Sequence, residues 1–264
     1  MASTKFPWIE RYKDGAISLK TRLPINAHTR QFVNSEIESF RHSVIPICGE
    51  DTHRRPCLLG SGVLVSYSGA TVLLTAAHVL LDNIGIPLFV FGADGLGKFL
   101  DLDFSLDEDA DLGAMRLSAK DLAVLSHTRP LPEQMIATTG FNGGRFYGSV
   151  VGYPASSSKR PEKNALHTSM EVYSNFGTEL IGDRVSISFD WKDGAFSDAD
   201  GHVKARKPTG KSGGAIFGFP ATINSVLPRV RPKLVGIASR WKRQESRIEG
   251  PGPSSIGRIL KTVT

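Results

Sequence analysis

The sequence predicts an all-β protein built from two similar barrels, and three observations support this. Short apolar runs rich in β-branched residues recur along most of the chain. Polar turn segments separate them, and 27 glycines and 15 prolines are many for a helical protein of 264 residues. The runs also fall into two successive series, each close to the size of a six-stranded barrel.

A turn-rich junction at 130–144 separates the two series. The first contains SVIPICG (43–49), CLLGSGVLVSY (57–67), ATVLLTAAHVL (70–80), PLFVFG (87–92), FLDLDF (99–104) and DLGAMRL (111–117). The second contains FYGSVVGYP (146–154), ALHTSMEVYS (165–174), DRVSISFDW (183–191), GGAIFGF (213–219) and KLVGIASRW (233–241). AKDLAVLS (119–126) can form a helical turn or a connector.

We expect four segments: an N-terminal extension (1–42), a first barrel (43–130), a second barrel (131–245) and a C-terminal tail (246–264). NSEIESFR at 34–41 predicts a short helix capped by Asn34 or Ser35. SSIGRILKTVT in the tail can form another, capped by Ser254 or Ser255. The extension and the loops at 155–164 and 220–233 are candidate regulatory or docking surfaces.

The composition is that of an ordinary globular protein, with 40% hydrophobic and 22% charged residues. No stretch approaches the roughly 20 consecutive apolar residues of a membrane helix. The first twenty residues lack the apolar core of a signal peptide. Cys48 and Cys57 are too few for a disulfide framework, and we expect two reduced thiols. These features together predict a cytoplasmic protein without a membrane partner.

The formal net charge of +6 is unevenly spread, with acidic residues gathered at 101–111 and basic residues at 204–247. A basic half could bind nucleic acid or favour acidic substrates. No aromatic platform alternates with these residues and no binding motif accompanies them, so nucleic acid is not the expected partner. A solubilising surface explains the charge equally well.

One histidine and one aspartate stand out by their neighbours. His78 follows the strand ATVLLT and two small alanines, which let the backbone pack tightly and project the imidazole into a cleft. Asp111 begins an apolar strand, where a carboxylate can be partly buried beside an imidazole. Asp107, Glu108 and Asp109 are expected to be solvated loop charges, and among them only Asp109 competes with Asp111 for this role.

Ser212 lies in PTGKSGGAIFG, between Gly210 and a pair of glycines. An oxyanion hole needs two backbone N–H groups aimed at one point, which requires a tight turn with little side-chain obstruction. Gly210 and Ser212 would supply these donors. ARKPTGKS also nearly matches a phosphate-binding loop, but Ala205 replaces its first glycine and a strand-like run follows instead of a helix. We therefore reject nucleotide binding.

TAAH, DLGAMRL and GKSGG follow one another in the order His, Asp, Ser, and together they resemble the chymotrypsin/trypsin-like serine proteases. The resemblance spans residues 43 to 241 and includes VVGYP, which is similar to the opening strand of the second barrel in bacterial members. It implies two six-stranded antiparallel β-barrels with an active site between them. It also implies a serine endopeptidase with His78 as base, Asp111 as its orienting partner, Ser212 as nucleophile, and no metal or organic cofactor.

The chain departs from the digestive members of this family at two positions. Lys211 stands where they carry an aspartate that pairs with a new N-terminus, so activation by cleavage is not expected. Val79 replaces a cysteine found in many secreted relatives. The chain looks more like intracellular bacterial members, in which narrow specificity or an activating protein partner would restrain the enzyme.

The resemblance also maps substrate-binding positions. Ser239 in LVGIASRW would lie beside the substrate backbone, and Arg206 at the base of the primary pocket would favour an acidic side chain, with Arg240 and Lys207 adding to the field. Trp241 could narrow that pocket, and Arg206 could instead point to solvent. The rival function is a latent or inactive protease fold that serves as a binding module.

Overall fold

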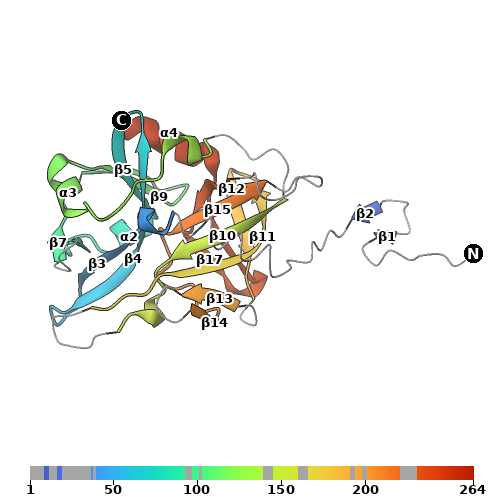
Figure 1. The fold of residues 1–264 in the computed structure, drawn as a ribbon, viewed down its shortest axis with the longest axis horizontal. Helices are drawn as coiled ribbons and strands as arrows, with labels where there is room; N and C mark the ends of the chain where they lie inside the picture. Colours follow the sequence, from blue (N-terminus) through green and yellow to red (C-terminus); the bar gives the residue numbers. More distant parts are fainter. Residues whose placement is uncertain are drawn as a thin grey trace, which may run out of the picture.

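The chain folds into two antiparallel sheets packed side by side (Figure 1). The computed structural model describes residues 9–11, 17–19, 37, 40–92, 97–100, 103–138, 145–159, 166–190, 194–197, 201–220 and 231–264. The short strands β1 (Ile9–Arg11) and β2 (Ile17–Leu19) form a separate pair. Most of the helix expected at 34–41 lies outside the described residues, although Ile37 and Phe40 are both helical.

The first sheet has the strand order β7-β6-β3-β4-β5-β9-β8. Its strands are β3 (Val44–Glu50), β4 (Pro56–Tyr67), β5 (Ala70–Thr75), β6 (Phe89–Phe91), β7 (Gly97–Phe99), β8 (Phe104–Asp107) and β9 (Leu112–Arg116). Six of them form a continuous antiparallel path, and the three-residue β7 extends it beyond β6. The helices α2 (Ala77–Leu81) and α3 (Ala119–Val124) belong to this half.

The second sheet has the order β16-β15-β10-β11-β12-β18-β17, with the hairpin β13–β14 attached to β11. Its strands are β10 (Arg145–Gly152), β11 (Glu171–Leu180), β12 (Arg184–Ser188), β13 (Gly194–Ser197), β14 (Gly201–Lys204), β15 (Ala215–Pro220), β16 (Lys233–Ile237), β17 (Arg240–Lys242) and β18 (Arg247–Pro251). A Cβ atom on Gly236 would lie only 2.9 Å from the Pro251 carbonyl, so β16 and β18 nearly close the six-strand path.

The predicted fold class, an all-β chymotrypsin-like pair of six-stranded antiparallel barrels, is confirmed, with short strands added to each. The expected run KLVGIASRW divides into β16 and β17. The division occurs because the Ala238 amide donates a hydrogen bond to the Gly214 carbonyl, whereas the Ser239 amide donates one to the Glu249 carbonyl. Strand β18 lies in the segment expected to be a tail, yet it pairs with β12 and β17.

Side chains that point alternately to the two faces of each strand create an apolar core that both sheets share. Val63 and Val65 of β4 face this shared core, whereas Leu64 between them faces the interior of the first sheet. Phe217 of β15 faces the shared core as well, and its neighbour Ile216 faces the interior of the second sheet. The two sheets therefore pack through one apolar layer, at whose edge the candidate site is built.

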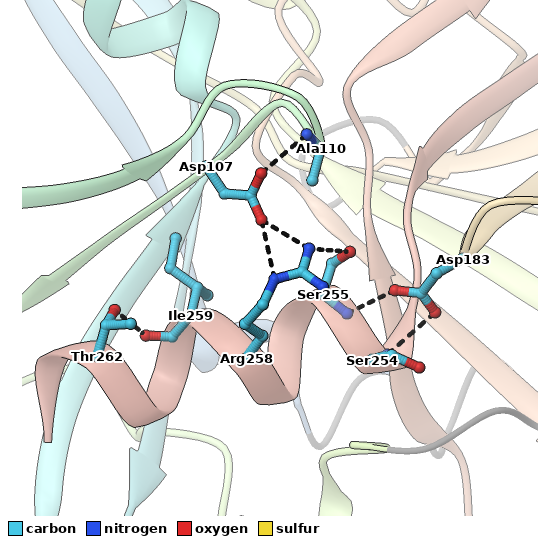
Figure 2. A network of polar contacts seen from close by, with 8 residues as sticks. All are labelled: Asp107, Ala110, Asp183, Ser254, Ser255, Arg258, Ile259 and Thr262. Atoms are coloured by element: carbon cyan, nitrogen blue, oxygen red, sulfur yellow. Dashed lines mark hydrogen bonds and ion pairs between the residues drawn. The ribbon is translucent and has the colours of Figure 1, made fainter.

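The C-terminal helix α4 (Pro253–Val263) is tied to both sheets, as Figure 2 shows. At its start, the carboxylate of Asp183 accepts hydrogen bonds from the amides of Ser254 and Ser255, at 3.1 and 2.5 Å. The expected caps Ser254 and Ser255 are therefore wrong, because the cap comes from the turn between β11 and β12. Farther along, Arg258 Nη2 donates to Asp107 Oδ2 at 2.7 Å.

Asp107 was expected to be a solvated charge, and the structure corrects this. Its other carboxylate oxygen accepts the Ala110 amide at 3.1 Å, so it holds the turn that leads into Asp111. The hydrogen bond from Arg258 lowers the pKa of Asp107 below its ordinary value. The last helix thus fixes the loop that carries a candidate site residue.

Both cysteines are free, as expected, with Cys48 buried and Cys57 partly exposed. Burial, reinforced by the nearby Cys57, raises the pKa of the Cys48 thiol to about 12. Among the described residues, no helix is both long and apolar enough to cross a membrane.

Candidate functional site

His78 is held where the first sheet ends in a short helix. Strand β5 stops at Thr75, and Ala76 and Ala77 are fully buried as the chain turns into α2. Only small side chains fit this close turn, which explains the alanine pair. The His78 imidazole is left about one-third exposed, with its side chain at 36% relative exposure.

Asp111 lies beside this imidazole in a left-handed backbone conformation, with φ of +61°. Both carboxylate oxygens lie 3.0 Å from His78 Nδ1, and Oδ1 also accepts the His78 amide at 3.1 Å. Asp111 is buried, so these contacts replace lost water. Aspartate tolerates positive φ better than most residues, which suits this tight turn. Asp109, the competing aspartate, has no such contact with His78 among the described residues.

Each member of the His78–Asp111 pair favours the charged form of the other. The hydrogen bond with Asp111 raises the pKa of His78 above its ordinary value of 6.5, against the opposing effect of burial. Burial raises the pKa of Asp111, but the hydrogen bonds from His78 bring it below its ordinary value of 3.8. The Arg240 Nε lies 3.8 Å from Asp111 Oδ2 and adds to this lowering. The pair is therefore an ionised carboxylate against a basic imidazole.

The loop around Ser212 is shaped by two glycines with positive φ, Gly210 at +90° and Gly213 at +85°. Side chains rarely adopt this conformation. The amides of Lys211, Gly213 and Gly214 all donate to backbone carbonyls at 2.7–2.9 Å. Among the described residues, no backbone carbonyl accepts a hydrogen bond from the amides of Gly210 and Ser212. Two unused donors thus flank Lys211, as an oxyanion hole requires.

Ser61 of β4 joins this loop to the first sheet, and the sequence analysis missed it. Its amide donates to the Ser212 carbonyl at 2.7 Å, and its hydroxyl donates to the Gly210 carbonyl at 3.1 Å. That hydroxyl also accepts the Tyr153 amide at 3.0 Å, while the Ser61 carbonyl accepts from Thr75 at 2.8 Å. A polar serine inside the apolar run CLLGSGVLVSY was the available signal in the sequence.

Two neighbouring cavities border these residues. A small one of about 70 Å³ is lined by Pro208, Thr209, Lys211, Ser212, Ala238, Ser239, Arg240, Trp241 and Ile248. A second of about 400 Å³ is lined by Ala77, His78, Leu81, Glu108, Asp111, Ser239 and Arg240. Ser239 and Arg240 line both, so the cavities adjoin with Ser212 on one side and His78 on the other. No hydrogen bond joins Ser212 to His78 in the described part of the chain.

The structure brings Ser239 and Trp241 to the small cavity but does not bring Arg206 there. Arg206 is not among the described residues that line it. Its Nε instead lies 4.0 Å from Oε2 of Glu171, a buried residue at the start of β11. The pocket-floor position expected for Arg206 is therefore not observed.

Lys211, between these two amides, is buried, with a relative exposure of 1%. Its Nζ lies 2.6 Å from Glu171 Oε1, and both side chains are almost completely excluded from solvent. Glu171 is a second residue that the sequence analysis missed. Among the described residues, no group of three or more histidine, cysteine, aspartate or glutamate side chains could hold a metal ion.

Comparison with known proteins gives similarity in structure only. No family model and no curated protein matches the chain. A solved serine protease domain of the Sesbania mosaic virus polyprotein is 12% identical, covers 81% of this chain and 91% of its own, and has a TM-score of 0.46. The inactive form of a serine-to-alanine mutant of Rv3671c from Mycobacterium tuberculosis is 15% identical, with coverages of 90% and 94% and a TM-score of 0.44.

A third structure, from work on the coupled folding and binding of the intrinsically disordered Sesbania mosaic virus VPg protein, is 13% identical. It covers 85% of this chain and 97% of its own, with a TM-score of 0.47. Structural similarities with TM-scores below 0.5 do not identify the reaction. The proposed reaction therefore rests on the residues of this chain.

Proposed function

We propose that this protein is a serine endopeptidase that uses Ser212, His78 and Asp111. The observation that supports this most strongly is the buried Asp111 carboxylate, 3.0 Å from Nδ1 of a partly exposed His78. This contact holds the proton on Nδ1, so that Nε2 is free to accept one. Ser212 lines the small cavity and His78 lines the adjoining one, which supports the Ser212 hydroxyl as the nucleophile.

In the proposed reaction, His78 Nε2 takes the proton of the Ser212 hydroxyl as its oxygen attacks the peptide carbonyl. The negative charge that develops on the carbonyl oxygen is bound by the amides of Gly210 and Ser212. His78 then gives its proton to the leaving amine, and an acyl-enzyme remains on Ser212. Water, deprotonated by His78, hydrolyses that ester and regenerates the serine.

Strand β17 supports a peptide as the substrate. It contains Trp241, begins directly after Ser239, and is the last strand in the order of the second sheet, where it pairs with β18 and with no other described strand. An extended peptide can add to such an edge through backbone hydrogen bonds. Ser239 and Arg240 would then contact the residues that precede the scissile bond.

Latency is the second candidate, and one observation favours it. Ser212 and His78 are not hydrogen-bonded in the described structure, so their final approach could await a substrate or a protein partner. Catalytic hydrogen bonds often shorten only in the enzyme–substrate complex. The missing contact is therefore compatible with an active peptidase as well as with a latent one. A cytoplasmic, bacterial-type peptidase restrained in this way remains part of the proposal.

Covalent labelling of the purified chain with a fluorophosphonate tests the proposed function. The wild-type chain should label at Ser212, and Ser212→Ala and His78→Ala should both abolish labelling. Addition of a cell extract to an unlabelled chain would test for a partner that completes the site. Failure to label under both conditions would leave a binding module as the function.

The labelling rate should depend on pH through His78. Only the neutral imidazole can accept the serine proton, and the Asp111 contact raises the pKa of His78 above 6.5. The rate should therefore rise with pH and reach half its maximum above pH 6.5. Rates measured between pH 5 and 9 would contradict the proposed base if they showed no such rise.

The small cavity should restrict the side chain that precedes the scissile bond. About 70 Å³ is far below the roughly 300–1,000 Å³ of typical ligand pockets, and Trp241 forms part of the wall. We expect cleavage after small residues, and Trp241→Ala should shift preference in a peptide library toward larger apolar residues. Arg206→Ala should leave that preference unchanged, because Arg206 lies beside Glu171.

A further inference from the structure

The strongest unexplained feature outside the proposed triad is the buried charge pair of Lys211 and Glu171. Lys211 is 1% exposed and Glu171 is fully buried, and Lys211 directly precedes Ser212 in the chain. Burial lowers the pKa of Lys211 below its ordinary value, and Glu171 opposes this. Burying two charges is expensive in free energy, so an apolar pair would hold the sheet at less cost.

Glu171 contacts the Ser212 loop at two points. Its Oε1 accepts from Lys211 Nζ at 2.6 Å and from the Arg206 amide at 3.4 Å, and its Oε2 faces Arg206 Nε at 4.0 Å. One carboxylate therefore fixes both the residue that enters the loop and the residue beside the nucleophile. The backbone of Glu171 is held between two strands, because it pairs with Gly152 on one side and Ser197 on the other.

The position of Lys211 determines where the two unused amides point. Lys211 donates its own amide to Pro208 and accepts the Gly214 amide at 2.8 Å, so a shift of its side chain would move the whole turn. The space around it is closed: a Cβ atom on Gly152 would lie 3.4 Å from Lys211 Cα, and one on Gly214 only 2.3 Å from the Val151 carbonyl. The turn is therefore tightly packed around Lys211.

We propose that Glu171 is a positioning residue, which through Lys211 holds the Gly210 and Ser212 amides in the geometry of an oxyanion hole. This inference rests on the proposed function for its consequence in catalysis. Both members of the ion pair belong to this chain, since β11 supplies the Glu171 carboxylate and the Ser212 loop supplies the Lys211 ammonium. This contact therefore needs no new N-terminus from proteolytic cleavage.

The test compares wild type, Glu171→Gln, Lys211→Met and the double variant Glu171→Leu/Lys211→Met. Asp121→Asn is the matched control, because Asp121 is buried but caps the distant helix α3. Two quantities are measured under conditions where each variant is folded: the rate of fluorophosphonate labelling, and hydrogen exchange of the amides in residues 206–214.

Both single variants should label roughly 100-fold more slowly, the order of effect of losing an oxyanion-hole donor. The Lys211 and Gly214 amides should exchange faster in them, and Asp121→Asn should change neither quantity. The double variant should regain thermal stability while its labelling stays slow. Wild-type labelling in the double variant, or unchanged exchange at 206–214 in Glu171→Gln, would overturn the inference.

The two proposals fail in different ways. If the wild-type chain does not label, the proposed function fails, and the exchange measurement alone still decides whether Glu171 positions the loop. If the wild-type chain labels and the double variant labels equally fast, the peptidase stands and Glu171 is only structural.

Discussion

Replacing Asp111 by asparagine should lower the rate of covalent labelling by about 10⁴-fold while leaving the chain folded. Asp111 accepts from His78 Nδ1 at 3.0 Å with both carboxylate oxygens. An asparagine amide can donate a hydrogen bond to Nδ1, which stabilises the tautomer with its proton on Nε2. That tautomer cannot accept the serine proton, and in a Ser-His-Asp triad such a change costs about four orders of magnitude in turnover.

The same variant separates chemistry from folding. Asparagine adopts the left-handed conformation at least as readily as aspartate, so the φ of +61° at this position should survive. Labelling rates and the midpoint of urea unfolding would be measured together with those of Asp109→Asn, the neighbouring acidic residue. A 10⁴-fold loss confined to Asp111→Asn would support the proposed role, and equal losses in both variants would contradict it.

The sequence was informative wherever a local pattern determines structure. Runs such as ATVLLT predicted their strands because a short, nearly continuous apolar run is typical of a strand that is buried on both faces. Strand β18 was missed because RIEGP has only one large apolar side chain, and pairing with β12 and β17 stabilises it. The break at Ala238 was missed because hydrogen bonds to residues distant in sequence cause it.

The same distinction between local patterns and long-range contacts applies to the residues of the candidate site. His78, Asp111 and Ser212 could be proposed because each lies in a short motif with a chemical reason for its neighbours. Glu171 could not be assigned, since its partner Lys211 is 40 residues away. A charged residue inside the apolar run ALHTSMEVYS was nevertheless a signal, because a buried carboxylate requires a partner.

Breaking the Lys211–Glu171 pair should have the largest effect on stability. We expect Glu171→Gln and Lys211→Met each to lower the free energy of unfolding by about 3–5 kcal/mol, because each leaves one buried charge without its partner. Urea unfolding of the purified variants would measure this. Arg55→Ala is a suitable control: its ion pair with Asp51 is partly exposed, so the unfolding midpoint should hardly move.

The double variant Glu171→Leu/Lys211→Met decides whether charge or packing causes the loss. With both charges removed, the desolvation cost disappears with the attraction, and buried ion pairs replaced by apolar side chains are often neutral or stabilising. The double variant should therefore unfold near the wild-type midpoint, although the two single variants do not. If the losses of the single variants simply added, altered packing at each position would explain them, because coupling between paired charges makes their effects non-additive.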